Sequence, residues 1–476
     1  MLTAIYGAQK FIYIEGQFFQ SAFGKEQVGS LEDAASGPMA ALTNITSLPG
    51  YEKYAKRLGI YGVQPDQVPA SIRVSQIDDI RRDPNGEGAL FLRDLNSILS
   101  NIAAIKISRG LGGPQNSLLN PIGEALASRI ESAIYDDQPF HVYMVLPVHP
   151  EGTLNTLNIM TQLHLTMQSL VFGSHSLINR IRRAILVARL LEAGNVKKSQ
   201  ALEEVSNYEL KEVVKKGGDD WKRFLTLLNL RNWEMLGSRP VTEQIYVHSK
   251  LLIADDRVAV LGSANINDRS QLGNRDSELA VVIRDDNQLS VKLDGLHDDF
   301  VSENVHQLRI RLWKKIFGLM GSTQPANNLA GFVDKPAARE SWRAIQDVAY
   351  SNALEYKKAF PFLANIRGEQ SSIWPTWDRR TRSLLSHMPF NERFWRPNAV
   401  RDATLSWEAK TRNDERSPVN IRGFIVALPV SWTMNENNSS GMNLTLLAND
   451  DIPDHRDSSS VASNDLQGDN GTNAWS

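Results

Sequence analysis

Cysteine is absent from this chain of 476 residues, which excludes disulfide bonds and thiolate metal sites. Long apolar runs are absent too, because no stretch approaches the roughly 18–20 residues that a membrane-spanning helix needs. The first residues lack the basic start and the apolar region of a signal peptide. An excess of positive charge is also lacking: 52 Lys and Arg face 54 Asp and Glu, for a net charge of −2. Binding to nucleic acid is therefore not indicated.

The remaining composition is that of a folded protein. The apolar fraction is 42%, which supports a core, and the length allows more than one domain. We expect a soluble or peripheral membrane protein, whose compartment the sequence leaves open.

A pair of chemically active side chains occurs once. Of nine histidines, only His248 is followed two residues later by a lysine, Lys250. The apolar residues around them predict a buried strand from Ile245 to Ile253. Because side chains alternate along a strand, His248 and Lys250 would point the same way. A polar turn at 254–257 and a second apolar run, 258–261, predict an antiparallel return that ends in a small-residue loop at 262–265.

These residue types suit a phosphodiester. An imidazole titrates near neutrality, so His248 can attack phosphorus or carry a proton. Lys250 would neutralise the phosphate oxygens, and Ser263 and Asn265 can donate hydrogen bonds to them. A histidine also needs an orienting carboxylate, for which Glu278 is the candidate. Asp276 is the next carboxylate to test, and the scheme requires no metal.

The motif resembles a known family. The pattern His248-x-Lys250-x4-Asp255, the run GSANINDRS at 262–270, and Glu278 are similar to the second HKD half-site of the phospholipase D superfamily. The similarity extends to residues 12–19, which read IYIEGQFF. In this segment Gly16 replaces the asparagine usual in eukaryotic-type members. The similarity also covers the segments 141–147 and 421–429.

The resemblance implies an architecture. We expect an α/β/α sandwich lobe with a mixed sheet over about residues 1–320. A mainly helical and irregular extension, 321–434, would pack on this lobe, and a polar tail, 435–476, would be disordered. Residues 21–117 would form a loop-rich insert in the lobe.

The resemblance also implies a function: hydrolysis or transphosphatidylation of glycerophospholipids through a phosphohistidine, giving phosphatidic acid and a head-group alcohol. His248 would be the acid and base, Lys250 and Asn265 would stabilise the transition state, and Asp255 would have a supporting structural role. The residues expected to bind substrate are Ser263, Asn267, Glu15 and Gln17. For Glu15 and Gln17 the alternative is an edge strand with polar side chains in solvent. No cofactor or metal is expected.

The family builds one active site from two HKD half-sites, and this sequence has one. We therefore expect a C-terminal fragment or the product of a split reading frame, with little activity alone. The first lobe would lie on the same or another chain, or a homodimer would supply both half-sites. A phospholipid membrane surface is the expected partner and nucleic acid is not. A superfamily nuclease, an inactive membrane- or partner-binding remnant, and a secreted bacterial effector all remain open.

Two further predictions concern single residues, Asn120 and His149. Asn120 is expected to cap a helix that begins with Pro121 and ends near Ile134. His149 follows a predicted strand, so it is either a secondary site residue or a surface histidine in a proline turn.

Overall fold

The computed structural model describes residues 1–24, 50–58, 88, 91–92, 95, 118–151, 162–360, 363, 375–378, 383–386 and 420–431, with gaps at 164, 195, 238, 274–275 and 323. Three predictions lie outside these residues: most of a helix expected over 90–107, tryptophans 374 and 395 as interfacial residues, and disorder of the tail 435–476.

An eight-stranded mixed sheet forms the centre of the described protein, with the order β12-β3-β2-β1-β5-β6-β7 and β4 paired to β3. The three strands β1, β2 and β3 run parallel, and the other pairings are antiparallel. The strands are β1 Phe11–Glu15, β2 His141–Val145, β3 Leu225–Leu236, β4 Arg239–Gln244, β5 Leu251–Ala254, β6 Val258–Gly262, β7 Ala280–Ile283 and β12 Ile425–Ala427. The short pairs β8 Gln288–Val291 with β9 Asp299–Ser302, and β10 Pro375–Asp378 with β11 Ser383–Ser386, are separate.

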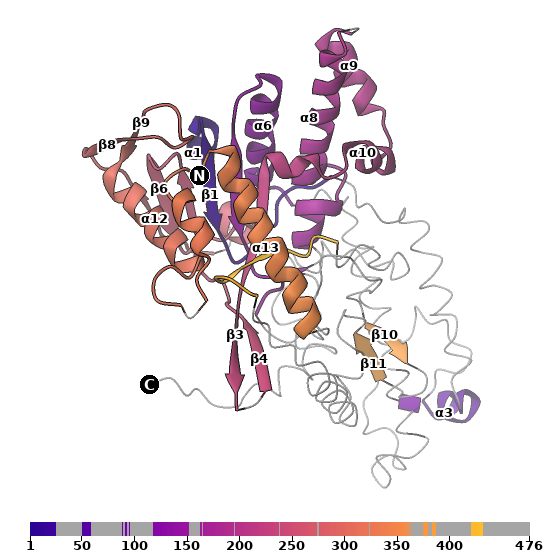
Figure 1. Cartoon of the computed structure of the whole chain (residues 1–476). Helices are drawn as coiled ribbons and strands as arrows, with labels where there is room; N and C mark the ends of the chain where they lie inside the picture. Colours follow the sequence, from indigo (N-terminus) through magenta and orange to yellow (C-terminus); the bar gives the residue numbers. More distant parts are fainter. Residues whose placement is uncertain are drawn as a thin grey trace.

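Helices cover both faces of the sheet (Figure 1). The first layer contains α1 Leu2–Gly7, α6 Ile122–Tyr135, the π-helix η5 Gln168–Phe172 and α8 Leu177–Glu192, followed by α9 Lys198–Ser206, α10 Leu210–Gly217 and the 3-10 helix η6 Asp220–Arg223. The second layer contains α12 Glu303–Ile316, η7 Asn327–Phe332 and α13 Arg339–Ala359. The short helices α3 Tyr51–Arg57 and α11 Asp268–Gln271 lie in the connections.

The alternation of apolar side chains in β1 explains the two layers. Ile12 and Ile14 pack into the core beneath α6 and α8, whereas Phe11 and Tyr13 pack into the core beneath α12 and α13. A strand whose two faces are both buried reads as a nearly continuous apolar run, as β1 does from Phe11 to Ile14. The predicted α/β/α sandwich with a mixed sheet is confirmed.

The C-terminal extension completes this core. Trp342 and Ile345 of α13 are buried on the second face, and Ile425 of β12 joins the same core. β12 pairs with β3 across nearly 200 residues of sequence. The extension therefore supplies part of the second layer and one strand, rather than only packing on a finished lobe.

One helix boundary differs from its prediction. α6 begins at Ile122 with Pro121 as its N-cap, and no side chain caps it. Asn120 instead donates from Nδ2 to the carboxylate of Asp268 (2.8 Å) and to the carbonyl of Gln20. A buried amide gains more from these tertiary acceptors than from one helix terminus.

A turn of two aspartates joins β5 to β6. Asp255 and Asp256 have φ of 52° and 53°, the left-handed region that costs most residues energy. Asp256 is fully buried, bonds His306 Nδ1 at 2.7 Å and forms an ion pair with Arg309 of α12 at 2.7 Å. These contacts tie the turn to the second layer. Asp255 points elsewhere, as described below.

Candidate active site

The segment 245–250, which carries His248 and Lys250, is irregular and lies between β4 and β5. The predicted strand is therefore wrong over these six residues, since pairing begins at Leu251. Among them only Val247 is buried, with 5% of its surface exposed, and it anchors the segment in the second core. Because no ladder of backbone hydrogen bonds orients the segment, side-chain contacts must do so.

Glu15 anchors this segment to the sheet through Ser249. It lies at the end of β1, a central strand flanked by β2 and β5, so the edge-strand alternative is wrong. Its carboxylate accepts hydrogen bonds from Tyr13 Oη and Ser249 Oγ, both at 2.6 Å. Burial raises the pKa of Tyr13 well above its usual value, and the Glu15 charge adds to this rise, so the phenol stays a donor. Ser249, between His248 and Lys250, is thereby fixed to the sheet.

Gln17 holds the lysine. Its Oε1 accepts from Lys250 Nζ at 2.9 Å, and its Nε2 donates to Tyr246 Oη at 2.9 Å. Lys250 Nζ also donates to the His248 carbonyl at 2.6 Å. An ammonium has three N–H donors, so within the described structure one remains for a ligand. Partial burial lowers the pKa of Lys250, while the Glu278 charge opposes that shift.

His248 is exposed, and its ring nitrogens have no hydrogen-bond partner among the described residues. The Tyr246 ring lies 6.2 Å away, centroid to centroid. Glu278 instead accepts a short hydrogen bond from Ser263 Oγ, and Ser263 in turn accepts from the Leu279 N–H at 3.1 Å. Because Ser263 donates to Glu278, the orienting role of Glu278 stays a prediction.

The loop after β6 reaches the end of β1. Gln20 N donates to Ile266 O at 2.8 Å, and Phe19 forms a parallel bridge with Ile266. Asn265 precedes this contact, and its buried Oδ1 has no partner among the described residues. Asn267 instead caps α11 by accepting from Ser270 N at 3.0 Å. Because an amide oxygen accepts hydrogen bonds, as phosphate oxygens do, the substrate contact expected of Asn265 stays a prediction, and the Asn267 acceptor is already occupied.

Asp255 lies away from this surface. The residue is only 1% exposed, and its carboxylate accepts from the N–H groups of Gln9 (2.6 Å), Lys10 (2.8 Å) and Phe11 (2.9 Å). Burial raises its pKa, opposed by these three hydrogen bonds. These contacts fit the structural role expected for the aspartate of the motif.

Asp268 is a site residue that sequence reasoning missed. It accepts from the backbone N–H of Leu119 at 2.8 Å and of Asn120 at 2.9 Å, besides the Asn120 amide. It thereby ties the loop after β6 to the segment before α6. The only signal for it was its place within the GSANINDRS run.

Two secondary candidates have other partners. Asp276 forms a two-point ion pair with Arg269, with distances of 3.0–3.1 Å. His149 bonds the Pro150 carbonyl at 2.8 Å, and burial lowers its pKa. Neither is shown in contact with His248. The described residues include no group of three or more His, Asp or Glu placed to hold a metal ion, and no described helix is long and apolar enough to span a bilayer.

The α/β/α sandwich thus brings together an exposed histidine and a lysine that Gln17, just after β1, holds in place. The chain belongs to the phospholipase D family, because a family model described as Phospholipase D matches residues 46–369.

Curated relatives agree with this assignment. Phospholipase D2 of Bos taurus is 32% identical over 251 residues, which cover 51% of this chain and 22% of the relative. Phospholipase D B of Dictyostelium discoideum is 32% identical over 241 residues, or 51% of this chain and 17% of the relative. Phospholipase D1 of Homo sapiens is 30% identical over 253 residues, covering 52% and 20%. The chain thus spans about a fifth of the length of these relatives.

Proposed function

We propose that this chain supplies one half of a phospholipase D active site, which hydrolyses or transphosphatidylates glycerophospholipids to phosphatidic acid and a head-group alcohol. The observation that carries the proposal is the pair of contacts from β1, Glu15 to Ser249 and Gln17 to Lys250. They hold a lysine beside an exposed histidine, as recognition of a phosphodiester requires.

The chemistry follows from two imidazoles. The histidine of the other half-site attacks phosphorus, and the P–N bond forms as the bond to the head-group oxygen breaks. His248 gives its proton to the departing alcohol and then removes one from water. That water attacks phosphorus, breaks the P–N bond and releases phosphatidic acid. Lys250 and Asn265 would offset the charge on the phosphate oxygens. One imidazole cannot occupy both in-line positions, so His248 requires a partner.

An exposed apolar surface beside the site supports a partner. We call it the β7 edge and define it by Leu261, Leu279, Val281 and Val282, which are 40%, 75%, 52% and 58% exposed. β7 is the last strand of the sheet, so its outer edge has no strand neighbour in the described sheet. An open edge with large exposed apolar residues is a place for association. We propose that it contacts the other HKD lobe, on the same or another chain, or a second copy of this chain.

The relatives' names and the neutral charge balance favour a phospholipid over nucleic acid as substrate. A membrane surface is accordingly the proposed partner, with the chain bound peripherally.

The test measures choline or ethanolamine release from mixed phospholipid vesicles. The purified chain is assayed alone over a range of concentrations, with its mass followed by light scattering, and again with a first HKD lobe from a family member. We expect little activity from a monomer. His248→Ala should lower any activity present by roughly 100- to 10,000-fold, the usual contribution of a general acid and base. Full activity from a monomer would refute the two-half-site argument.

A matched pair of variants tests the β7 edge. Leu279→Glu places a charge on this edge, and Leu296→Glu places one on a leucine of similar exposure elsewhere, 72% against 75%. Leu279→Glu should weaken association with the partner, whereas Leu296→Glu should not. Equal effects of the two variants would exclude the β7 edge as the contact surface.

A further inference from the structure

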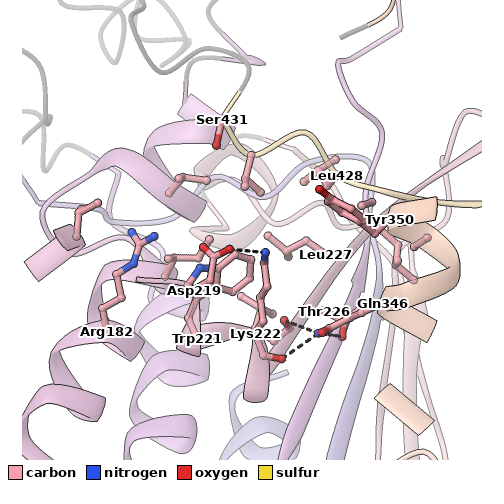
Figure 2. Close-up of a pocket in the computed structure, with 18 of the residues that line it drawn as sticks. Arg182, Asp219, Trp221, Lys222, Thr226, Leu227, Gln346, Tyr350, Leu428 and Ser431 are labelled. Atoms are coloured by element: carbon pink, nitrogen blue, oxygen red, sulfur yellow. Dashed lines mark hydrogen bonds and ion pairs between the residues drawn. The ribbon is translucent and has the colours of Figure 1, made fainter. Parts of the chain in front are cut away.

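A cavity of about 490 Å³ lies between side chains of several helices and strands, among them Arg182, Leu227 and Leu428 (Figure 2). It is bounded by α8 and η6, by the beginning of β3, by α13, and by the segment after β12. The part of β3 that lines it, Leu225 to Leu228, is level with Ile12 to Glu15 of β1, but β2 lies between these two strands, and the lining includes none of Glu15, Gln17, His248 and Lys250. The cavity is therefore distinct from the candidate active site. Its volume is in the range of small-molecule sites, roughly 300–1,000 Å³.

The topology explains the opening. β12 has three residues and pairs only with Leu228, Asn229 and Leu230 of β3. After Leu428 bonds the Leu227 carbonyl at 3.1 Å, the chain turns away, and β12 covers no earlier part of β3. The gap at the sheet edge is flanked by α8 on one face and α13 on the other, so two helical layers enclose it without a strand between them.

The walls are mostly apolar. Phe172 and Ile178 contribute from the first layer, Leu227 from β3, and Leu428 and Val430 from the segment after β12. At about 30 Å³ for each group of the size of a water molecule, the cavity holds roughly 16 such groups. That suits one acyl chain of moderate length with a small head group, and not a lipid with two chains.

The lining includes four charged side chains, Arg182, Asp219, Lys222 and Asp347, and of these Arg182 is buried without an ion-pair partner among the described residues. Arg182 is 8% exposed and donates from Nε to the Gly218 carbonyl and from Nη1 to Asn179 Oδ1, both at 2.9 Å. Both acceptors are neutral, and no described carboxylate lies within ion-pair distance of this guanidinium. The nearby Asp219 carboxylate pairs with Lys222 at 2.6 Å instead.

The other deeply buried arginine among the described residues has a carboxylate as its counterion. Arg309 is fully buried and has the Asp256 carboxylate at 2.7 Å. A buried cation without such a partner is costly. Burial lowers the pKa of Arg182, and the nearby Asp219 charge opposes that shift only in part. An anion bound in the cavity would supply the partner that Arg182 lacks.

We propose that this cavity binds a single-chain lipid anion, with its head group on Arg182 and its acyl chain along the apolar walls. A fatty acid carboxylate and a lysophosphatidate phosphate share this chemistry, since both accept hydrogen bonds from a guanidinium. The site is independent of HKD chemistry, so it can be tested whether or not the proposed function holds.

Titration calorimetry on the full chain, freed of lipid, tests the proposal with three lipids of about the size that the cavity holds: laurate, hexanoyl-lysophosphatidate and the uncharged mono-octanoylglycerol. We expect saturable binding of one ligand per chain for at least one anion, and weaker binding of the uncharged lipid. The preferred anion identifies the source of the head group. No saturable binding of either anion, or equal affinity for the uncharged lipid, would overturn the proposal.

A matched pair of variants isolates the charge. Arg182→Met keeps the aliphatic stem, on which Gly217 of α10 packs closely, and should weaken anion binding roughly 10- to 100-fold. Arg189→Met is the control, because Arg189 lies on the same helix and also bonds the end of α10, at Lys216 O, but does not line the cavity. Equal affinities of the two variants would show that Arg182 only caps α10, and the proposal would fail.

A third variant covers the case in which Arg182→Met does not fold, as judged by circular dichroism. Val430→Trp adds bulk to the cavity from the irregular segment after β12, without changing α8. It should weaken binding of the charged and the uncharged lipid alike. Undiminished anion binding by this variant would place the lipid elsewhere and refute the site.

Discussion

Asp255, the aspartate of the HKD motif, is predicted to stabilise the fold rather than to act on substrate. The change that tests this is Asp255→Ala, which removes the acceptor of three backbone N–H groups, those of Gln9, Lys10 and Phe11. The three groups lie at the start of β1, so their loss would loosen the strand that carries Glu15.

The magnitude can be worked out from burial. Phe11 is fully buried, so its unpaired N–H costs about 1–3 kcal/mol. Gln9 is exposed and Lys10 is half-buried, and water replaces part of the loss, leaving about 0.5–1 kcal/mol each. Alanine at φ 52° adds about 1–2 kcal/mol of left-handed strain. The free energy of unfolding should therefore fall by about 3–7 kcal/mol.

Urea denaturation followed by circular dichroism measures this change, and related variants separate its causes. Asp255→Gly removes the acceptors without the strain, so it should cost less than alanine by about 1–2 kcal/mol. Asp137→Ala is the control, because Asp137 also has a positive φ, 49°, but is exposed. If Asp255→Ala costs no more than Asp137→Ala, the structural role assigned to Asp255 is wrong.

Further predictions concern the site and the pH dependence of stability. Glu278→Gln should lower the activity of the two-lobe enzyme roughly 10- to 100-fold with the fold intact. It should also shift the basic limb of the pH–rate profile to lower pH, because the Glu278 charge raises the pKa of Lys250. An unmoved limb would show that Glu278 does not influence Lys250. Burial lowers the pKa of His141 from 6.5 to about 3, so the folded protein keeps this imidazole neutral while the unfolded chain protonates it. Stability present above pH 6.5 should therefore be lost as the pH falls towards 3, by up to about 1.4 kcal/mol per pH unit, and urea midpoints of His141→Gln should lack this component. An unchanged slope in that variant would assign the acid sensitivity to other groups.

The fold was predictable from sequence where burial leaves a local pattern. The predicted helix from Pro121 to Ile134 is α6, and the apolar run at 258–261 is β6, which pairs antiparallel with β5 as predicted. The pairing of β12 with β3 and the place of α13 in the second layer depend on contacts between distant segments. Local periodicity carries no information about such contacts.

The site was predictable in its residues but less so in its geometry. The motif identified His248, Lys250 and Asn265, yet the strand predicted through the first two is irregular. Apolar alternation favoured a strand there, and the polar contacts from Glu15 and Gln17 prevailed over it. The capping of α11 by Asn267 and the hydrogen bonds of Asp268 to Leu119 and Asn120 depend on how the folded chain is arranged. Residue spacing in the sequence does not give that arrangement.

The two-aspartate turn has a consequence for how such motifs persist. Asp255 bonds the start of β1, and Asp256 bonds α12 on the other side of the sheet, so the fold itself requires both carboxylates. Selection for folding alone would retain them in a descendant that had lost its histidine and lysine. The presence of the aspartate therefore indicates only descent from the family. The presence of His248 and Lys250, which contribute little to the stability of the fold, indicates that the chemistry is retained.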